Sequence, residues 1–238
     1  MTPPFVGVPP PRRRPRASGD PRLEAIWRAL HERYGPRFWW PAATPFEVLV
    51  GAILTQNTAW KNVEHALRNL RRADALSPGA ILGMKNGRLE RLLHPSGYFR
   101  LKAQRLRSAV RWLAERGGGK VERLRRLPLE RARADLLSVR GVGPETADSI
   151  LNYAAGRRTF VADLYSRRVV VRHGLLPPGT GYEGTRRFFV ERLRRSLYVT
   201  QEFHALLVAV GNRHCRARPR CEGCPLRPLL PPGGPLPD

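Results

Sequence analysis

A short turn between two helical patterns constrains the fold of this 238-residue chain more than any other stretch. The turn is Gly141-Val142-Gly143-Pro144. Apolar residues spaced by three and four flank it, at Leu129, Ala132 and Leu136 before it and at Ala147, Ile150, Leu151 and Ala154 after it. Glycine permits positive φ and proline suits the first position of a helix. The pattern predicts two helices joined at a tight corner. Either the free N–H groups of the second helix are directed at an anion such as a phosphate, or the corner is an ordinary one without a ligand.

Helical periodicity extends along most of the chain. Asp20-Pro21 predicts the start of a first helix, and Thr44-Pro45 predicts a second, which runs to Leu54 and is apolar on every side. A helix of that kind lies in the middle of a bundle. Because no segment alternates convincingly with a period of two, we expect an all-α fold.

Charge points to a polyanionic partner. The 43 basic residues exceed the 19 acidic ones, which gives a formal net charge of +24. A bias toward arginine codons explains why the only lysines are Lys61, Lys85, Lys102 and Lys120, but it does not explain the excess of bases over acids. No apolar run is long enough for a membrane span, and the N-terminus lacks a signal core, so a cytoplasmic protein is expected.

The turn and the segment after it resemble a known superfamily. Leu137-x3-Gly-Val-Gly-x2-Thr-Ala, followed by Val161-x-Asp163-x4-Arg168, is similar to the helix-hairpin-helix DNA glycosylases, which include the endonuclease III-like enzymes. The resemblance covers residues 22–230 approximately. It implies two helical domains flanking a DNA-binding cleft. The expected parts are a disordered basic arm (1–19), a first helix that packs with the C-terminal domain (20–40), a central domain with the hairpin (41–155), a C-terminal helical domain (156–214), a cysteine loop (215–230) and a Pro-rich tail (231–238).

The resemblance also assigns functional residues. Asp163 takes the place of the carboxylate that catalyses base release, although an aspartate there is equally suited to cap the helix that follows. A carboxylate can stabilise the positive charge that develops on the sugar and can deprotonate a water. The hairpin is expected to grip the DNA backbone, and two loop residues are expected to fill the gap left by an extruded base. These DNA-binding residues are Gly141, Val142, Gly143, Thr146, Gln56 and Tyr98; as alternatives, Gln56 is an ordinary polar loop group and Tyr98 a half-buried aromatic.

Glu145 decides whether strand cleavage is expected. Family members that also cut the DNA backbone carry a lysine nucleophile at the second position after the second glycine of the turn. Here that position is Glu145. A carboxylate cannot form a Schiff base, so the sequence resembles the monofunctional branch, which leaves an abasic site.

Three tryptophans suggest the substrate. Trp39, Trp40 and Trp60 flank the apolar helix in a pattern that resembles a bacterial 3-methyladenine glycosylase of the same superfamily, where aromatic rings stack on the extruded base. Electron-rich rings favour a cationic alkylpurine. Packing in the core is the alternative role of each tryptophan. The chain departs from that enzyme at Gly211-Asn212, where the enzyme has Gly-Lys, and in having a C-terminal cysteine loop.

The three cysteines, Cys215, Cys221 and Cys224, resemble the iron–sulfur loop of endonuclease III, whose pattern is Cys-x6-Cys-x2-Cys-x5-Cys. The first spacer is one residue short, and Leu230 stands where the fourth cysteine is expected. Three interpretations remain: a [4Fe–4S] cluster with a different or labile fourth ligand, zinc held with His214, or a loop without metal. In each case the loop would present Arg216, Arg218 and Arg220 to DNA phosphates.

The sequence therefore predicts a monomeric base-excision glycosylase that acts on double-stranded DNA with a damaged base, with alkylated purines as the suggested substrates. Two alternatives stay open. One is an endonuclease III-like or mismatch enzyme for oxidised pyrimidines, uracil, thymine or adenine mispairs. The other is a non-catalytic helix-hairpin-helix module that only binds DNA.

Overall fold

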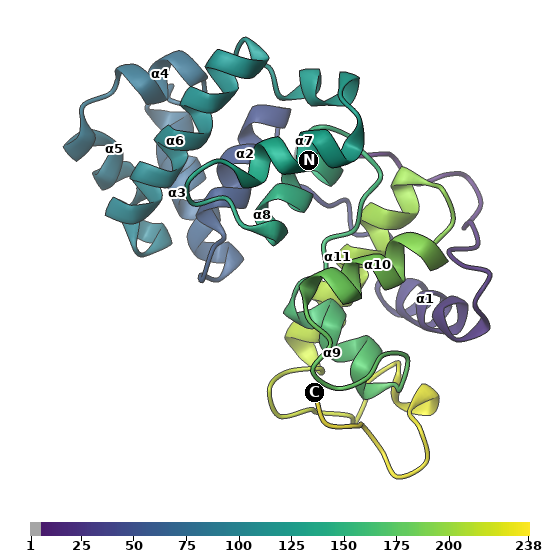
Figure 1. Ribbon diagram of the computed structural model, residues 1–238. Helices are drawn as coiled ribbons and strands as arrows, with labels where there is room; N and C mark the ends of the chain where they lie inside the picture. The colour runs from purple at the N-terminus through teal and green to yellow at the C-terminus, as the bar shows by residue number, and fades with distance from the viewer. Residues whose placement is uncertain (1–5) are drawn as a thin grey trace. The chain divides into compact units, whose positions relative to one another are not determined.

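The computed structural model describes residues 6–238, which divide into two compact units (Figure 1). Among the described residues, the first unit comprises Val6 and residues 40–157, and the second comprises residues 7–39 and 158–238. Apart from one isolated bridge between Ser18 and Leu193, regular structure in this part of the chain is helical. The expected all-α fold is confirmed.

The first unit contains the helices that carry the Gly141–Pro144 turn. Its α-helices are α2 (Pro45–Leu54), α3 (Trp60–Arg72), α4 (Pro78–Gly83), α5 (Asn86–Leu93), α6 (Phe99–Gly117), α7 (Leu129–Leu137) and α8 (Pro144–Ser149). Shorter turns are η1 (His94–Ser96), η2 (Val121–Arg126) and the π-helical η3 (Ile150–Ala154), which continues α8.

Helix α2 is the core of the first unit. Every residue from Phe46 to Leu54 is buried, and the helix packs against α3, α6, α8, η2 and η3. Its start is capped as expected, because the Thr44 side chain accepts the Glu47 N–H. The Glu47 carboxylate in turn accepts the N–H of Ala43, at 3.0 Å, and pairs with Arg71. These contacts fix where the chain enters the helix, and so where the loop after Leu54 leaves it.

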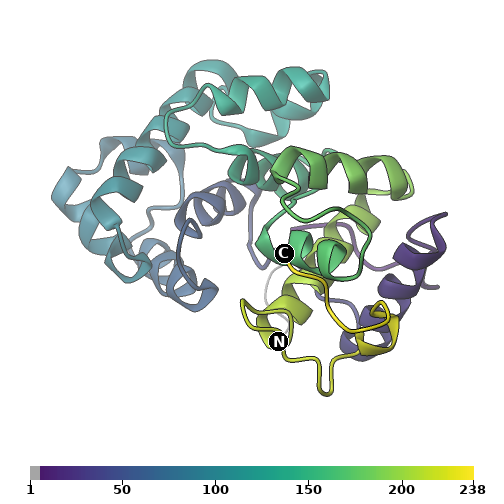
Figure 2. The ribbon, with the colours of Figure 1, turned by 60° about the horizontal axis from the view of Figure 1, so that its bottom comes forward.

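The second unit combines α1 (Pro21–Tyr34) with α9 (Leu164–Arg172), α10 (Tyr182–Arg192), α11 (Leu197–Arg213) and the short η4 (Arg227–Leu229). Helix α11 packs against α1 and α9, and Figure 2 shows the chain turned by 60° from the view of Figure 1. Aromatic rings fill the core: Trp27 of α1 meets Phe203 of α11 edge-on, and Phe160 stacks on Phe189 at 3.9 Å between ring centroids. The apolar faces read from the sequence therefore meet here, although α1 and α11 are far apart along the chain.

The segment before α1 differs from the disordered arm that its composition suggested. Ala17 and Ser18 are fully buried, and both backbone N–H groups bond to the Glu24 carboxylate. Trp27 Nε1 donates to the Pro15 carbonyl at 3.0 Å. The expectation is therefore wrong for residues 15–18, because a buried carboxylate and an indole supply partners for the backbone; residues 1–5 lie outside the described part.

No helix in the described part of the chain is both long enough and apolar enough to traverse a bilayer.

Candidate active site

The hairpin forms where the sequence places it. Helix α7 ends at Leu137 and α8 begins at Pro144, with the Val142 N–H bonded to the Val139 carbonyl at 3.0 Å. Gly141 has φ +90°, a conformation that favours glycine. Gly143, which precedes α8, offers no side-chain cap to the helix, whereas Val142 and Thr146 are buried. A backbone hydrogen bond thus closes the turn itself.

A buried ion pair joins the two hairpin helices. The Arg133 guanidinium on α7 donates to both carboxylate oxygens of Asp148 on α8, at 3.1–3.2 Å. The Asp148 side chain is fully buried, and that of Arg133 is 10% exposed. A bidentate pair of this kind fixes the angle between the helices as well as their separation.

Asp163 caps helix α9 in the second unit. Its Oδ1 accepts the Ser166 N–H at 2.8 Å, and its Oδ2 lies 3.6 Å from His204 Nε2 of α11. The carboxylate is 12% exposed. The capping role anticipated for Asp163 is therefore observed, and it leaves the carboxylate fixed in orientation rather than free to rotate.

Tyr165, two residues after Asp163 on α9, contacts the end of α11. The Tyr165 hydroxyl donates to the Asn212 side-chain carbonyl at 2.7 Å. The Tyr165 ring lies so close to Gly211 that a Cβ there would come within 2.3 Å of it. Gly211-Asn212, the dipeptide that departs from the alkyl-base enzyme, therefore packs beside the helix that starts at Asp163.

The two loops expected to enter DNA belong to the first unit. Tyr98 has φ +44° and is 71% exposed, so its ring projects from the loop before α6. Gln56, after α2, is half-buried, and its amide donates to the Gly141 carbonyl at 3.0 Å and to the Thr146 hydroxyl at 2.9 Å. In this state Gln56 is therefore bound to the hairpin.

Lys102 connects the bases of these two loops. Its ammonium donates to the carbonyls of Leu54, at 2.8 Å, and Ser96, at 2.5 Å. Burial, together with the nearby Arg105 charge, lowers the pKa of Lys102 to about 8. Lys102 is 1% exposed, so its ammonium links the two loop backbones and is not a nucleophile at the surface.

The three tryptophans differ in their burial and in the unit to which they belong. Trp40 and Trp60 lie in the first unit in an edge-to-face contact with centroids 5.3 Å apart, and Trp40 is 5.4 Å from Tyr153. Trp40 is only 3% exposed, which corresponds to the core-packing alternative. Trp60 keeps part of its surface accessible, and so does Trp39, which belongs to the second unit.

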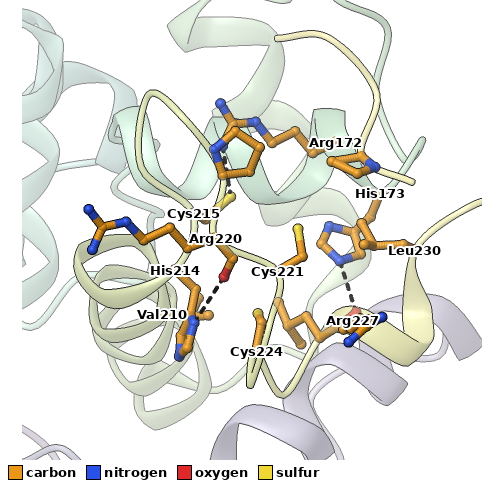
Figure 3. Close-up of a pocket in the computed structure, with 13 residues that line it drawn as sticks. Arg172, His173, Val210, His214, Cys215, Arg220, Cys221, Cys224, Arg227 and Leu230 are labelled. Atoms are coloured by element: carbon orange, nitrogen blue, oxygen red, sulfur yellow. Dashed lines mark hydrogen bonds between the residues drawn. The ribbon is translucent and has the colours of Figure 1, made fainter. Parts of the chain in front are cut away.

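The three cysteines line one small cavity of about 20 Å³ in the second unit, which has room for about one water molecule (Figure 3). Arg172 closes one side: its guanidinium lies 3.4 Å from Cys215 Sγ and also binds the carbonyls of Arg216 and Ala217 and the Asp238 carboxylate. Burial raises the pKa of the Cys215 and Cys224 thiols above the ordinary value. Arg216, Arg218 and Arg220 are exposed, as phosphate contacts require.

The donor set does not fit a four-thiolate iron–sulfur cluster. Leu230, at the spacing of the fourth cysteine, lines the cavity and offers no ligand atom. His214 places its Nδ1 3.1 Å from the Arg220 carbonyl. Over residues 6–238, no three His, Cys, Asp or Glu side chains are arranged to hold one metal ion. We therefore assign no step of the chemistry to a cluster.

Sequence reasoning missed several residues of these sites. His204 lies beside Asp163, 41 positions away in the sequence, and Arg105 binds Gln56, 49 positions away. Arg133 and Asp148 are 15 positions apart. Nothing in local periodicity links such partners. A charged residue on the inner face of an amphipathic helix is the one available signal, since a buried charge requires a partner. Lys102 and Arg133 both satisfy that rule.

Comparison with known proteins agrees with the geometry. A family model described as HhH-GPD superfamily base excision DNA repair protein matches residues 50–195. The protein of Methanocaldococcus jannaschii named "Putative DNA repair glycosylase" is 41% identical over 85% of this chain and 92% of its own length. Endonuclease III of Haemophilus influenzae is 29% identical over 87% of this chain and 93% of its own.

Solved structures show the same fold. A trapped endonuclease III–DNA covalent intermediate superposes with a TM-score of 0.73 over 87% of this chain and 93% of its own, at 20% identity. The 3-methyladenine DNA glycosylase of H. pylori bound to 1,N6-ethenoadenine gives 0.69 over 81% of this chain and 97% of its own, at 25% identity. With the glycine hairpin, the capping aspartate and these relatives in agreement, the chain belongs to the HhH-GPD superfamily of base-excision DNA repair glycosylases.

Proposed function

We propose that this protein hydrolyses the N-glycosidic bond of an alkylated purine extruded from duplex DNA and leaves the strand intact. The observation that carries the proposal is the fixed carboxylate of Asp163, which the Ser166 N–H orients at the start of α9 after the hairpin. The relative that binds 1,N6-ethenoadenine, a modified purine, supports the substrate class.

The proposed reaction needs one carboxylate and one water. The C1′–N bond breaks and its electron pair leaves with the base, which for a cationic alkylpurine produces a neutral leaving group. The Asp163 carboxylate stabilises the positive charge on the sugar, and water then attacks C1′ and loses its proton to the carboxylate or to solvent. The base must leave the stack before this step, because its glycosidic bond is otherwise inaccessible.

Aromatic surface favours an electron-poor base. Trp60 donates its indole N–H to Glu64 at 2.9 Å, which orients the ring, and part of the ring stays accessible. A face of this kind attracts a cation by about 0.5–2 kcal/mol. In this proposal Trp60 stacks on the base, and Trp40 supports Trp60 from the core of the first unit.

The substrate prediction is tested by base release. We expect 3-methyladenine to be released from methylated duplex DNA faster than uracil or oxidised pyrimidines from matched duplexes, because only the alkylated base is cationic. Released bases are measured by chromatography under single-turnover conditions. Faster release of uracil or an oxidised pyrimidine would move the assignment to the endonuclease III or mismatch type, and no release from any duplex would leave a DNA-binding module.

Strand cleavage provides a second prediction. Glu145 holds the nucleophile position and Lys102 is buried against two carbonyls, so we expect no Schiff base with the abasic site. Product strands should stay uncut until heated in alkali, and borohydride should trap no covalent enzyme–DNA complex on a denaturing gel. The matched positive control is Glu145→Lys, which restores an amine at that position. An adduct with the unaltered protein would contradict the monofunctional assignment and direct attention to the exposed Lys61.

A further inference from the structure

Gln56, the residue proposed to enter the DNA stack, is held at both ends of its amide. Its Nε2 group donates to Gly141 and Thr146 of the hairpin, as described above. Its Oε1 accepts a bond of 2.6 Å from Nη1 of Arg105, on helix α6. Arg105 supplies a charged donor, and charge-assisted bonds are about twice as strong as neutral ones. The carbonyl end of the amide is thereby fixed toward α6 and the NH2 end toward the hairpin.

Arg105 also touches the hairpin directly. A Cβ placed on Gly141 would come within 2.3 Å of Arg105 Cγ, so the aliphatic part of the arginine covers the glycine of the turn. One side chain therefore contacts both the loop that carries Gln56 and the turn proposed to grip the DNA backbone. Lys102, one helical turn before Arg105 on α6, donates to the carbonyls of Leu54 and Ser96. These two residues precede Gln56 and Tyr98 in their loops.

We infer that Arg105 is a positioning residue that sets Gln56 in register with the DNA-binding hairpin. This inference rests on the proposed function, since it concerns how Gln56 fills the gap that an extruded base leaves in the duplex. A glutamine amide on a loop would otherwise sample several rotamers, and ordering such a side chain on binding lowers affinity. With Arg105 and the hairpin in place, the Gln56 side chain is already ordered in the protein before DNA binds.

The inference predicts a specific loss of gap recognition. Affinity is measured by fluorescence anisotropy for two duplexes of one sequence, one intact and one with a tetrahydrofuran abasic analogue in place of a single nucleotide. The unaltered protein should prefer the tetrahydrofuran duplex. In Arg105→Met we expect that preference to fall roughly tenfold, equivalent to about 1.4 kcal/mol, while affinity for the intact duplex stays within about twofold.

A double-mutant cycle separates positioning from direct contact. If Arg105 acts through Gln56, then Gln56→Ala should lower the preference by a similar factor, and the double variant should lose no more than either single one. Arg107→Met is the matched control: Arg107 is also half-buried on α6, but its guanidinium bonds to the carbonyls of Leu82 and Met84. It should keep the full preference.

Three outcomes would overturn the inference. An unchanged preference in Arg105→Met shows that Gln56 does not depend on Arg105. Additive losses, or weaker binding to both duplexes with a shallower salt dependence, make Arg105 a phosphate contact instead. An unaltered protein that does not prefer the tetrahydrofuran duplex removes the basis for any positioning role. Base release is assayed separately, so intact gap recognition without excision would contradict the proposed activity and leave this inference standing.

Discussion

Replacing Asp163 with asparagine is expected to lower the rate of base release by a factor of about 100 or more while DNA affinity stays within about threefold. The amide keeps an oxygen that can accept the Ser166 N–H, so helix α9 should remain capped. What is lost is the negative charge beside the sugar cation. Single-turnover release of 3-methyladenine, with circular dichroism to verify the fold, measures the effect.

Asp20 provides the matched control. It is also an aspartate that caps a helix of the second unit, with its Oδ1 accepting the N–H groups of Arg22 and Leu23. Asp20→Asn makes the same chemical change at a cap without a proposed catalytic role, and its base release should equal that of the unaltered protein. If Asp163→Asn also released base at the rate of the unaltered protein, Asp163 would only cap helix α9 and would have no catalytic role.

The ring of His204 lies beside the second carboxylate oxygen of Asp163. Its Nε2 lies 3.6 Å from the free carboxylate oxygen, and its ring meets Phe160 edge-on with centroids 6.2 Å apart. Phe160 in turn stacks on Phe189 in the core. The carboxylate is thus bordered by a helix cap on one side and by a packed ring on the other, which is the rigid support that a charge-stabilising group requires.

Local signals predicted the elements of this fold well. Caps at Asp20 and Thr44, each followed by proline, mark helix starts that the structure reproduces. The glycine turn likewise appears with the predicted conformation at Gly141. Each of these features depends on residues within four positions of each other, so no knowledge of tertiary contacts was needed.

Contacts between distant segments were not predictable in the same way. The composition of residues 15–18 suggested disorder, yet a single buried carboxylate, Glu24, orders that backbone. Trp40 was assigned to a base pocket by resemblance, and its burial against Tyr153 emerges only from packing. The Gln56 amide forms hydrogen bonds with Arg105, which is 49 positions away, and with Gly141, which is 85 positions away. In each case the partner is selected by the tertiary fold rather than by local sequence.

The ion pair between the hairpin helices gives the largest stability prediction. In Arg133→Met, the Asp148 carboxylate keeps its charge in a fully buried position and loses a bidentate partner. Removing one member of a buried pair costs about 3–5 kcal/mol of unfolding free energy, because the remaining charge loses a bidentate partner where water cannot replace it. We expect a loss of this size in denaturant unfolding. Duplex affinity should fall as well, since the pair fixes the helices on either side of the Gly141–Pro144 turn.

A neighbouring pair on α7 supplies the control. Arg131 binds Asp135 at 3.0 Å, but its side chain is 66% exposed, and exposed pairs contribute about 0–1 kcal/mol. Arg131→Met should therefore leave stability nearly unchanged. Arg133→Met combined with Asp148→Asn should regain part of the loss, because the amide carries no buried charge. Equally mild effects of Arg133→Met and Arg131→Met would mean that solvent or the other contacts of Asp148 compensate its charge. The angle between the hairpin helices would then be set by the apolar contacts of α7 and α8 rather than by this ion pair.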